Sequence, residues 1–354
     1  MKLSKVTYAL AIAVITALAL PGMRLFAQEK LDPNAAPNPY RMLDTWAQLP
    51  EGRPWGTPIG VELDHSDGKS IWVFDRCGAD NCAGSNVAPI MKFDSSGKLL
   101  ANFGAGMFNY PHGLFVDREG NVWVTDGRGE GGKGHTVIKF APDGKVLMTL
   151  GKPGVAGDGL DMLNSPSDVV VAPNGDIFVA DGHGEKTNDR VVKFSKDGKF
   201  IKAWGHMGSE PGDFREPHDL YVGGSKGWVY VADRQNNRVQ VFDQDGNFVA
   251  AWKQFGQPSA VYVDKNDNIY VGATYEAVAP GETALRPTAG PNDRAIVIGN
   301  AISGELKYLI PDPGDLTRMT DTGTSASGIA VDDQGNLYAA DVGFNNLRKY
   351  SRMR

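Results

Sequence analysis

Hydrophobic and polar positions alternate along this chain in short runs that are separated by turn residues. One copy of the pattern has runs at 113–117, 121–126 and 136–140, and a later copy has them at 219–222, 227–233, 238–242 and 248–252. Tight-turn pairs such as Asp245-Gly246 join the runs. A period of two between such turns is typical of antiparallel strands. We therefore predict that each copy folds as a four-stranded antiparallel meander.

The pattern recurs six times. The equivalent positions at the start of the first strand are Pro58, Pro111, Pro166, Pro217, Pro258 and Ala326, so that successive copies are 53, 55, 51, 41 and 68 residues apart. This is the period of propeller blades, and the apolar positions do not follow the 3.6-residue period of helical solenoids. We predict an all-β fold, a six-bladed β-propeller of four-stranded antiparallel blades.

The sixth copy runs out at Tyr350 after three strands. Because an open ring leaves unprotected sheet edges, we expect a segment around 42–49 to supply the missing strand. A length of 354 residues with 44 glycines suits one large all-β domain, which we place at 28–354. The Pro/Gly/Ala-rich stretch at about 276–293 predicts an exposed insertion in blade five.

Residues 1–27 have the pattern of a signal peptide. Lys2 and Lys5 precede an apolar run at 8–20, and a plausible cleavage site follows near Ala27. The apolar run is shorter than the roughly 20 residues that span a bilayer, which disfavours a membrane anchor. We expect a periplasmic or secreted protein that is not attached to the membrane after cleavage.

Charge and cysteine content narrow the class of protein. The net charge of −6 becomes −9 once 1–27 is removed, because that segment holds three basic residues and no acidic one. Such an acidic chain is a poor binder of nucleic acid or anionic membranes. Cys77 and Cys82 are the only cysteines and lie in a turn-like loop. In an oxidising compartment this spacing favours a local disulfide over a redox or zinc pair.

The predicted topology brings chemically active residues to one place. In an antiparallel blade the first strand begins where the second strand ends, so both sets of residues surround one mouth of the central channel. His112, His218 and Ser327 begin the first strands of blades two, four and six. The residues that follow the second strands add Arg76, Arg128, His183 and Arg234. We predict that this mouth collects imidazole and guanidinium groups.

Histidines at these positions suit a metal ion. Zinc commonly takes three protein ligands and keeps a fourth position for water or substrate. Blades two and four supply His112 and His218, and His183 of blade three lies between them. We predict a site for Zn²⁺ or a similar ion formed by His112, His183 and His218. The alternative is that these histidines are turn residues that hydrogen-bond across the channel.

Several phrases resemble a known family. The segment VADRQNNRV at 231–239 is typical of NHL repeats, and Tyr110-Pro111-His112-Gly113-Leu114 and Glu216-Pro217-His218 resemble the peptidyl-α-hydroxyglycine α-amidating lyases, which are NHL-repeat propellers. The similarity is best over 72–252. It implies zinc-dependent cleavage of a C-terminal α-hydroxyglycine to a peptide amide and glyoxylate, together with a structural Ca²⁺.

The resemblance also implies roles for single residues. His112 and His218 correspond to two of the family's three zinc ligands, and Arg76 corresponds to its arginine that engages the substrate near the metal. Where the family has its third zinc histidine, this chain has Ser327, and where the family has the acid that follows it, this chain has Gly328. His183 stands at the position of the family's catalytic tyrosine. The family's usual disulfides are missing. Arg76 and His183 are therefore the candidate catalytic residues, although no residue is an obvious replacement base.

Other polar residues have plainer interpretations. Arg76 and Arg234 either bind an anion or pair with Asp75, Asp233 or another carboxylate. Aspartates at the ends of second strands are expected to accept hydrogen bonds from backbone N–H groups in turns, and these are Asp126, Asp181, Asp233 and Asp341. The remaining histidines, His65, His135 and His206, have no partner that the sequence reveals, and they are expected on the surface.

Three functions compete. His112, His218 and Arg76 favour a metal-dependent lyase that acts on a small-molecule or peptide carboxylate. The loss of the family's residues at Ser327 and Gly328 favours a non-catalytic propeller that binds a peptide, a glycan or a partner protein. Metal-dependent lactone hydrolysis is the third, because six-bladed propellers carry several such activities, although a fold alone does not define a function.

Overall fold

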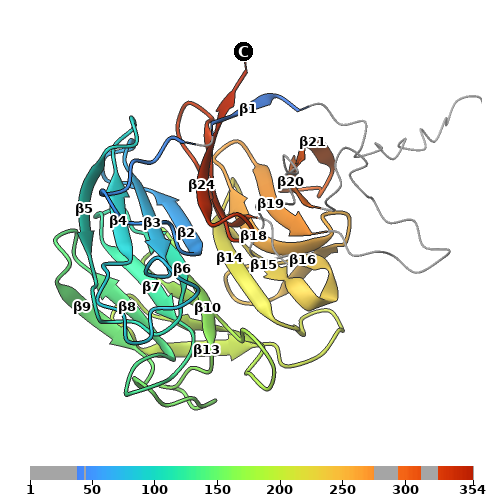
Figure 1. Cartoon of the computed structure of the whole chain (residues 1–354). Coiled ribbons are helices and arrows are strands. Elements are labelled where there is room, and N and C mark those ends of the chain that lie inside the picture. The colour runs from blue at the N-terminus through green and yellow to red at the C-terminus, as the bar shows by residue number, and fades with distance from the viewer. Residues whose placement is uncertain (1–37, 44, 275–293, 312–325, 354) are drawn as a thin grey trace, which may run out of the picture. The chain divides into compact units, whose positions relative to one another are not determined.

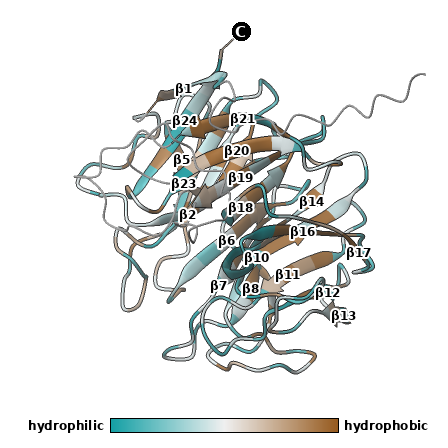
Figure 2. Cartoon of the chain, turned by 90° about the vertical axis from the view of Figure 1, so that its right-hand side faces the viewer, coloured by the Kyte–Doolittle hydropathy of each residue, from teal (hydrophilic) through white to brown (hydrophobic). Residues whose placement is uncertain are grey.

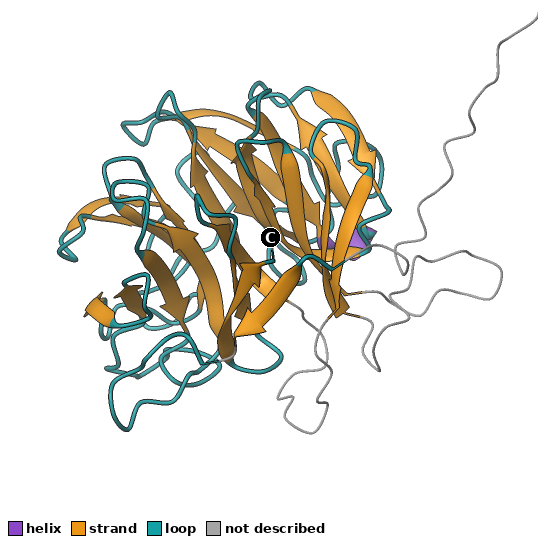
Figure 3. Cartoon of the chain, turned by 90° about the horizontal axis from the view of Figure 1, so that it is seen from above, coloured by secondary structure: helices purple, strands orange, loops and turns teal. Residues whose placement is uncertain are grey.

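The sheets form six blades of a propeller ring (Figures 1 and 3). The computed structural model describes residues 38–43, 45–274, 294–311 and 326–353. Every blade in this part is an antiparallel sheet of four strands, so the predicted six-bladed propeller is confirmed. The predicted signal peptide at 1–27 and the insertion at 276–293 lie outside the described residues, and a single domain over 28–354 stays a prediction. No helix among the described residues is long and apolar enough to cross a membrane.

The strands follow one another in chain order within each blade. Blade one contains β2 (Pro58–Leu63), β3 (Ile71–Asp75), β4 (Ile90–Phe93) and β5 (Leu99–Phe103). Blade two contains β6 (Pro111–Val116), β7 (Val122–Asp126), β8 (Thr136–Phe140) and β9 (Val146–Leu150). Blade three contains β10 (Pro166–Val171), β11 (Ile177–Asp181), β12 (Arg190–Phe194) and β13 (Phe200–Trp204).

The other three blades repeat this order. Blade four contains β14 (Pro217–Gly223), β15 (Trp228–Asp233), the short 3₁₀ helix η2 (Arg234–Asn236), β16 (Arg238–Phe242) and β17 (Phe248–Trp252). Blade five contains β18 (Gln257–Val263), β19 (Asn268–Thr274), β20 (Arg294–Asn300) and β21 (Leu306–Pro311). Blade six contains β22 (Ala326–Val331), β23 (Leu337–Asp341), β24 (Asn346–Arg352) and β1 (Tyr40–Leu43).

Burial decreases from the inner to the outer strand of a blade. All residues of β6 and β7 are buried, whereas β9 is largely exposed. The strands inside each blade are covered on both faces by neighbouring blades, and Figure 2 shows hydrophobic stretches in several of them, such as β16 and β20. Trp123 and Phe178 pack into one hydrophobic cluster that joins blades two and three. Burial of such aromatic rings dominates core energetics, which fixes the blades against one another.

The first and last described strands close the ring. β1 pairs with β24, with Tyr40 opposite Arg352, and the two strands lie side by side in Figure 1 as blue and red arrows. The inner strands β2 and β22 are also in contact. The prediction of an N-terminal closing strand is confirmed, but its bounds are Tyr40–Leu43 rather than 42–49. The expected segment is interrupted because Trp46 packs against Phe93 and Tyr338 instead of continuing the strand.

Aspartates at the ends of second strands hold the turns that lead into the inner strands. Asp126 accepts a hydrogen bond from the backbone N–H of Tyr110 at 2.6 Å, and Asp233 accepts one from Arg215 at 2.8 Å. Asp181 and Asp341 accept backbone N–H groups in the same way. The predicted role of the four aspartates is therefore confirmed. Two of these turns carry the histidines of blades two and four to the channel mouth.

Candidate metal centre

Three histidines from consecutive blades converge at one mouth of the channel. His112 lies in β6, His218 lies in β14, and His183 follows β11. One ligand atom of each lies within 4.8 Å of the others. The ring centroids are 4.4 Å apart for His112 and His183, 4.7 Å for His112 and His218, and 5.1 Å for His183 and His218. The structure thus brings together the three residues that were predicted as ligands.

Backbone carbonyls of the next blade fix the tautomers of two of these rings. Nδ1 of His112 donates to the carbonyl of Ser167 at 2.7 Å, and Nδ1 of His218 donates to the carbonyl of Ser259 at 2.7 Å. A carbonyl only accepts, so the proton of each neutral ring is on Nδ1 and the lone pair is on Nε2. Nε2 of His112 is buried and has no hydrogen-bond partner in the described part of the chain.

The third ring is oriented differently. Nε2 of His183 lies 3.4 Å from Oε1 of Glu216, and its Nδ1 is buried without a hydrogen-bond partner among the described residues. The backbone N–H of His183 donates to the carbonyl of Ser165 at 2.8 Å. Gly182 leaves room for this turn, since a Cβ there would lie 2.7 Å from the backbone nitrogen of Asp189.

Burial keeps all three imidazoles neutral. It lowers the pKa of His183 to about 3, and the nearby guanidinium groups of Arg234 and Arg76 add to this effect. Burial also holds the pKa values of His112 and His218 well below the usual value. Metal binding requires neutral imidazole, so three such rings with converging nitrogens fit a zinc-type ion.

Two departures from the lyase pattern lie in the inner strand of blade six. Ser327 lies in β22 and lines the same channel as His112 and His218, and its Oγ is buried without a hydrogen-bond partner in the described residues. A Cβ at Gly328 would lie 2.9 Å from the backbone nitrogen of Val61. The inner strands of blades one and six therefore lie too close together at this point for a side chain at position 328.

Arg76 is buried beside the histidines. Its Nε donates to the carbonyl of Pro111 at 3.1 Å, and no carboxylate within the described ranges lies within ion-pair distance of it. The alternative of an Arg76–Asp75 pair is wrong, because Asp75 pairs with Arg53 at 3.1 Å. Arg234 pairs with a different carboxylate, that of Glu216, at 3.7 Å.

A second guanidinium group, that of Arg128, lies near Arg76 in a polar pocket, as the prediction of guanidinium groups at this mouth requires, whereas the place of Tyr110 between them was not predicted. The Cζ atoms of Arg76 and Arg128 lie 3.9 Å and 3.8 Å from the ring centroid of Tyr110. The ring of Tyr110 lies 6.2 Å from that of His112 and 6.1 Å from that of His183. Arg76, Tyr110 and Arg128 line a pocket of about 300 Å³. The other residues that line it are Thr57, Asp80, Asn81 and Val342. No described carboxylate lies within ion-pair distance of either guanidinium group, and guanidinium groups in such a pocket suit a carboxylate.

Two buried acids in the channel were also missed. Asp168 follows Ser167 in β10, and Asp219 follows His218 in β14. Burial raises the pKa of Asp168 to about 7 and that of Asp219 well above the usual value. Each carboxylate accepts a hydrogen bond at 3.1 Å from a backbone N–H of the next inner strand, at Leu220 and Val261 respectively. These two hydrogen bonds therefore join neighbouring blades.

The structural Ca²⁺ that the resemblance implies stays a prediction.

Comparison with known proteins places the chain in a family. Residues 163–194 and 214–242 match the model of the NHL repeat. NHL repeat-containing protein 3 of Mus musculus is 30% identical over 343 residues, which cover 88% of this chain and 86% of the relative. The chain belongs to the NHL-repeat protein family. The human NHL repeat-containing protein 3 is 34% identical over 204 residues, which cover 55% of this NHL-repeat propeller and 54% of the relative.

The NHL-repeat propeller is also homologous to amidating enzymes. It is 40% identical over 147 residues to peptidyl-glycine alpha-amidating monooxygenase A of Xenopus laevis, which covers 40% of the propeller but only 15% of the relative. A probable peptidyl-alpha-hydroxyglycine alpha-amidating lyase of Caenorhabditis elegans is 40% identical over 141 residues, or 39% of the propeller and 38% of the relative. The NHL-repeat propeller thus spans a small part of the frog enzyme and about half of the human relative above.

Solved structures share the fold. A gluconolactonase of Xanthomonas campestris has a TM-score of 0.59 at 15% identity, covering 88% of this propeller and 89% of that chain. Virginiamycin B lyase of Staphylococcus aureus has a TM-score of 0.52 at 16% identity, covering 88% and 98%. At these identities the likeness shows the propeller fold alone.

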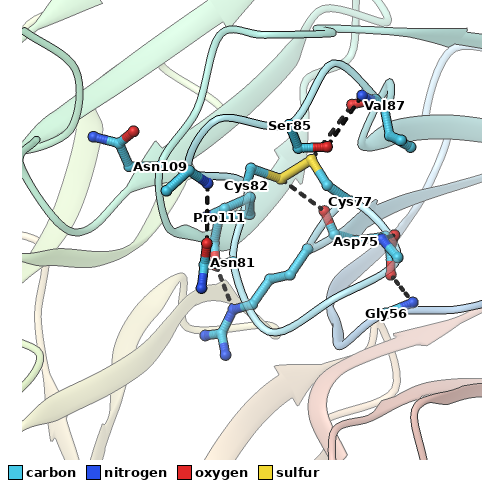
Figure 4. Close-up of a disulfide and its surroundings, with 12 residues drawn as sticks. Gly56, Asp75, Cys77, Asn81, Cys82, Ser85, Val87, Asn109 and Pro111 are labelled. Atoms are coloured by element: carbon cyan, nitrogen blue, oxygen red, sulfur yellow. Dashed lines mark hydrogen bonds between the residues drawn. A yellow bond between two sulfur atoms is a disulfide. The ribbon is translucent and has the colours of Figure 1, made fainter. Parts of the chain in front are cut away.

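A disulfide closes the loop that follows Arg76. Cys77 and Cys82 are bonded with their Cα atoms 5.3 Å apart, which confirms the predicted pair (Figure 4). The backbone N–H of Cys82 donates to the carbonyl of Asn109 at 2.8 Å, so the loop is attached to the turn before His112. Asp80 and Asn81 of this loop line the arginine pocket. The disulfide therefore stabilises one wall of that pocket.

Replacement of both cysteines by alanine is expected to lower the free energy of unfolding by about 2 kcal/mol, since the closed loop is short. It should also weaken carboxylate binding at Arg76 more than it changes the metal content. Urea denaturation and calorimetric titration with a hydroxyglycine peptide would measure the two effects. An unchanged binding affinity would mean that the loop does not support Arg76.

The other histidines have partners that the sequence does not reveal, and His65 and His135 are half-buried rather than exposed. The ring nitrogens of His135 lie 3.1 Å from the backbone nitrogens of Gly129 and Ser165, and the ring joins two loops. Nε2 of His65 lies 3.6 Å from a carboxylate oxygen of Glu62. His206 is exposed as expected, but its Nδ1 lies 2.9 Å from Asp213. These contacts come from loops whose approach the sequence pattern does not reveal.

Proposed function

We propose that this NHL-repeat propeller is a metal-dependent lyase that cleaves peptidyl-α-hydroxyglycine or a related small carboxylate and releases an amide and glyoxylate. The observation that carries the proposal is the convergence of three neutral imidazoles beside a pocket that is lined by two guanidinium groups. Homology to amidating lyases over part of the chain supports it.

The chain's own residues divide the work between metal and substrate. His112, His183 and His218 would hold the metal, which when bound supplies Lewis-acid polarisation of a substrate oxygen. Arg76 would hold the substrate carboxylate through two N–H groups, since a guanidinium matches a carboxylate bidentately. Arg128 would add a second positive charge on the solvent side of the same pocket, because it is exposed whereas Arg76 is buried.

The proposed reaction balances without a further reactant. The hydroxyl group of the substrate loses its proton and its carbon–oxygen bond becomes a carbonyl. The bond between that carbon and the amide nitrogen breaks, and the nitrogen keeps the electron pair and takes up one proton. No net oxidation or reduction occurs. Arg76 acts by orienting the carboxylate on the carbon where this bond breaks.

Substitution at Arg76 tests the proposal. We expect the mature protein with zinc to release glyoxylate from hydroxyglycine peptides, and Arg76→Lys to raise KM by roughly 10-fold or more, because lysine cannot form the bidentate contact. Arg118→Lys is the matched control, since this exposed arginine follows β6 at the end opposite His112. Absence of glyoxylate from a zinc-loaded wild type would end the lyase proposal.

A non-catalytic binding propeller is the second candidate. NHL repeat-containing protein 3 of Mus musculus, which matches 88% of this chain, is named for its repeats and not for a reaction. In addition, Gly328 and Ser327 stand where the lyase pattern has an acid and a third histidine. In that case hydroxyglycine peptides would bind at Arg76 without turnover. Lactone hydrolysis rests on the shared fold only, and the same zinc-loaded protein with simple lactones tests it.

We further propose that the protein is periplasmic or secreted. The Cys77–Cys82 disulfide supports export, because such bonds persist in oxidising compartments. The signal pattern at 1–27 supports it as well. Fractionation of cells that express the full chain, with N-terminal sequencing of the product, would test both.

A further inference from the structure

We propose that Glu216 is a positioning residue of the metal centre, which holds the His183 ring so that Nδ1 faces His112 and His218. The inference rests on the proposed metal centre and adds a residue that neither the sequence pattern nor the lyase resemblance assigns. It concerns how blade four supports a ligand that belongs to blade three.

The contact between the two side chains has the form of a carboxylate–histidine pair. Oε1 of Glu216 lies 3.4 Å from Nε2 of His183, and the two side chains are 13% and 12% exposed. A carboxylate beside Nε2 favours the proton on that nitrogen and leaves the lone pair on Nδ1. Nδ1 is buried, and no hydrogen-bond partner for it exists in the part of the chain that the structure describes.

This arrangement gives all three rings the same design. His112 and His218 each donate Nδ1–H to a backbone carbonyl and keep Nε2 available. His183 lies on a loop beyond β11, and it is oriented by a side chain instead of a carbonyl. Each ring therefore has one nitrogen beside an oxygen acceptor, and the other nitrogen has no hydrogen-bond partner among the described residues. Acceptors that fix the outer nitrogen are a regular feature of metal-binding histidines.

Glu216 is itself held firmly. Its backbone has a φ of 57°, in the left-handed region that non-glycine residues rarely adopt. Its N–H donates to Oδ1 of Asp189 at 2.8 Å, and its carbonyl accepts from the N–H of Arg234 at 3.3 Å. Gln235 donates to Oε2 at 2.7 Å, which leaves Oε1 for His183 and for Arg234 at 3.7 Å.

The position of Glu216 in the repeat supports a specific role. It directly precedes Pro217 and His218, at the start of the inner strand of blade four. The equivalent residues of blades one, two, three and five are Thr57, Tyr110, Ser165 and Gln257. Among these five blades, only blade four has an acid at this position. Blade four is also the blade that follows the one carrying His183. Blade four thus supplies both a ligand and the support for its neighbour's ligand.

Zinc affinity and a cobalt spectrum test the proposal in the mature protein. Glu216→Ala is expected to lower zinc affinity by roughly 10- to 100-fold, as loss of such outer partners does. Glu216→Gln should lose less, because its amide oxygen can still lie beside Nε2–H. Chelator competition measures the affinity, and the visible absorption of the Co²⁺-substituted protein reports the ligand arrangement independently of activity. Glu185→Ala, an exposed acid two residues after His183, is the matched control and should match wild type.

The outcomes separate this proposal from the proposed function. If wild type binds zinc and Glu216→Ala has the same affinity and the same cobalt spectrum, Glu216 does not position His183. If wild type binds neither zinc nor cobalt, the metal centre fails and this inference fails with it. If Glu216→Ala does not fold, Glu216→Leu decides, because it removes the acceptor and keeps a similar side-chain volume: an altered cobalt spectrum or a lowered zinc affinity supports the proposal, and unaltered values of both overturn it.

Discussion

Zinc is expected to bind the mature protein at about one ion per chain, and His183→Ala and His218→Ala are each expected to lose it. The three ligand atoms lie within 4.8 Å of one another, and the rings are neutral because they are buried. Removal of one ring leaves two nitrogens, so the loss of affinity should exceed the roughly 10- to 100-fold typical of changes outside the ligand set. Mass spectrometry of protein purified without an affinity tag measures the metal content.

His206→Ala provides the control for this experiment, because that ring is exposed and pairs with Asp213 away from the cluster. It should leave the zinc content unchanged. A wild type that stays free of metal after zinc is supplied would contradict the prediction. The histidines would then be understood as buried turn residues, and the protein as a binding propeller.

Asp233→Ala is expected to lower the free energy of unfolding by about 3–5 kcal/mol, the usual effect of removing one partner of a buried ion pair. The carboxylate of Asp233 is fully buried and accepts from Nε of Arg238 at 2.6 Å. It also accepts from the backbone N–H of Arg215 and from Gln240. The substitution would leave the Arg238 guanidinium buried without this carboxylate. Urea denaturation of both proteins measures the difference.

Asp245→Ala is the comparison for this variant, since Asp245 lies exposed in the turn between β16 and β17. Surface substitutions of this kind usually change stability by less than about 0.5 kcal/mol. Equal stabilities for the two variants would mean that the aspartates at strand ends do not hold the blades as described.

The propeller could be predicted from sequence because its signals are local and repeated. The runs at 136–140, 238–242 and 248–252 agree with strands β8, β16 and β17 residue for residue. His112 and His218 could be placed at one mouth because each follows the same proline of the repeat. Antiparallel pairing within the blades then brings the ends of second strands to the same side. That argument needs only chain order and strand direction.

Contacts between blades were beyond this reasoning. Asp75 and Arg76 are neighbours in sequence, but successive strand residues point to opposite sides. Asp75 binds Arg53, and Arg76 reaches the carbonyl of Pro111 in blade two. The Glu216–His183 contact likewise joins two blades through side-chain directions that no spacing reveals. The arrangement of Tyr110 between neighbouring loops was missed for the same reason.

The seam between β1 and β24 also determines how the ring responds to mechanical tension. Tyr40 and Arg352 are directly paired, so a force that pulls them apart loads one pair of residues at a time and separates the strands at low load. Blade six would open first. The three imidazoles belong to blades two, three and four, whose inner strands do not neighbour the inner strand of blade six. A propeller stretched at its seam would therefore keep its histidine cluster intact.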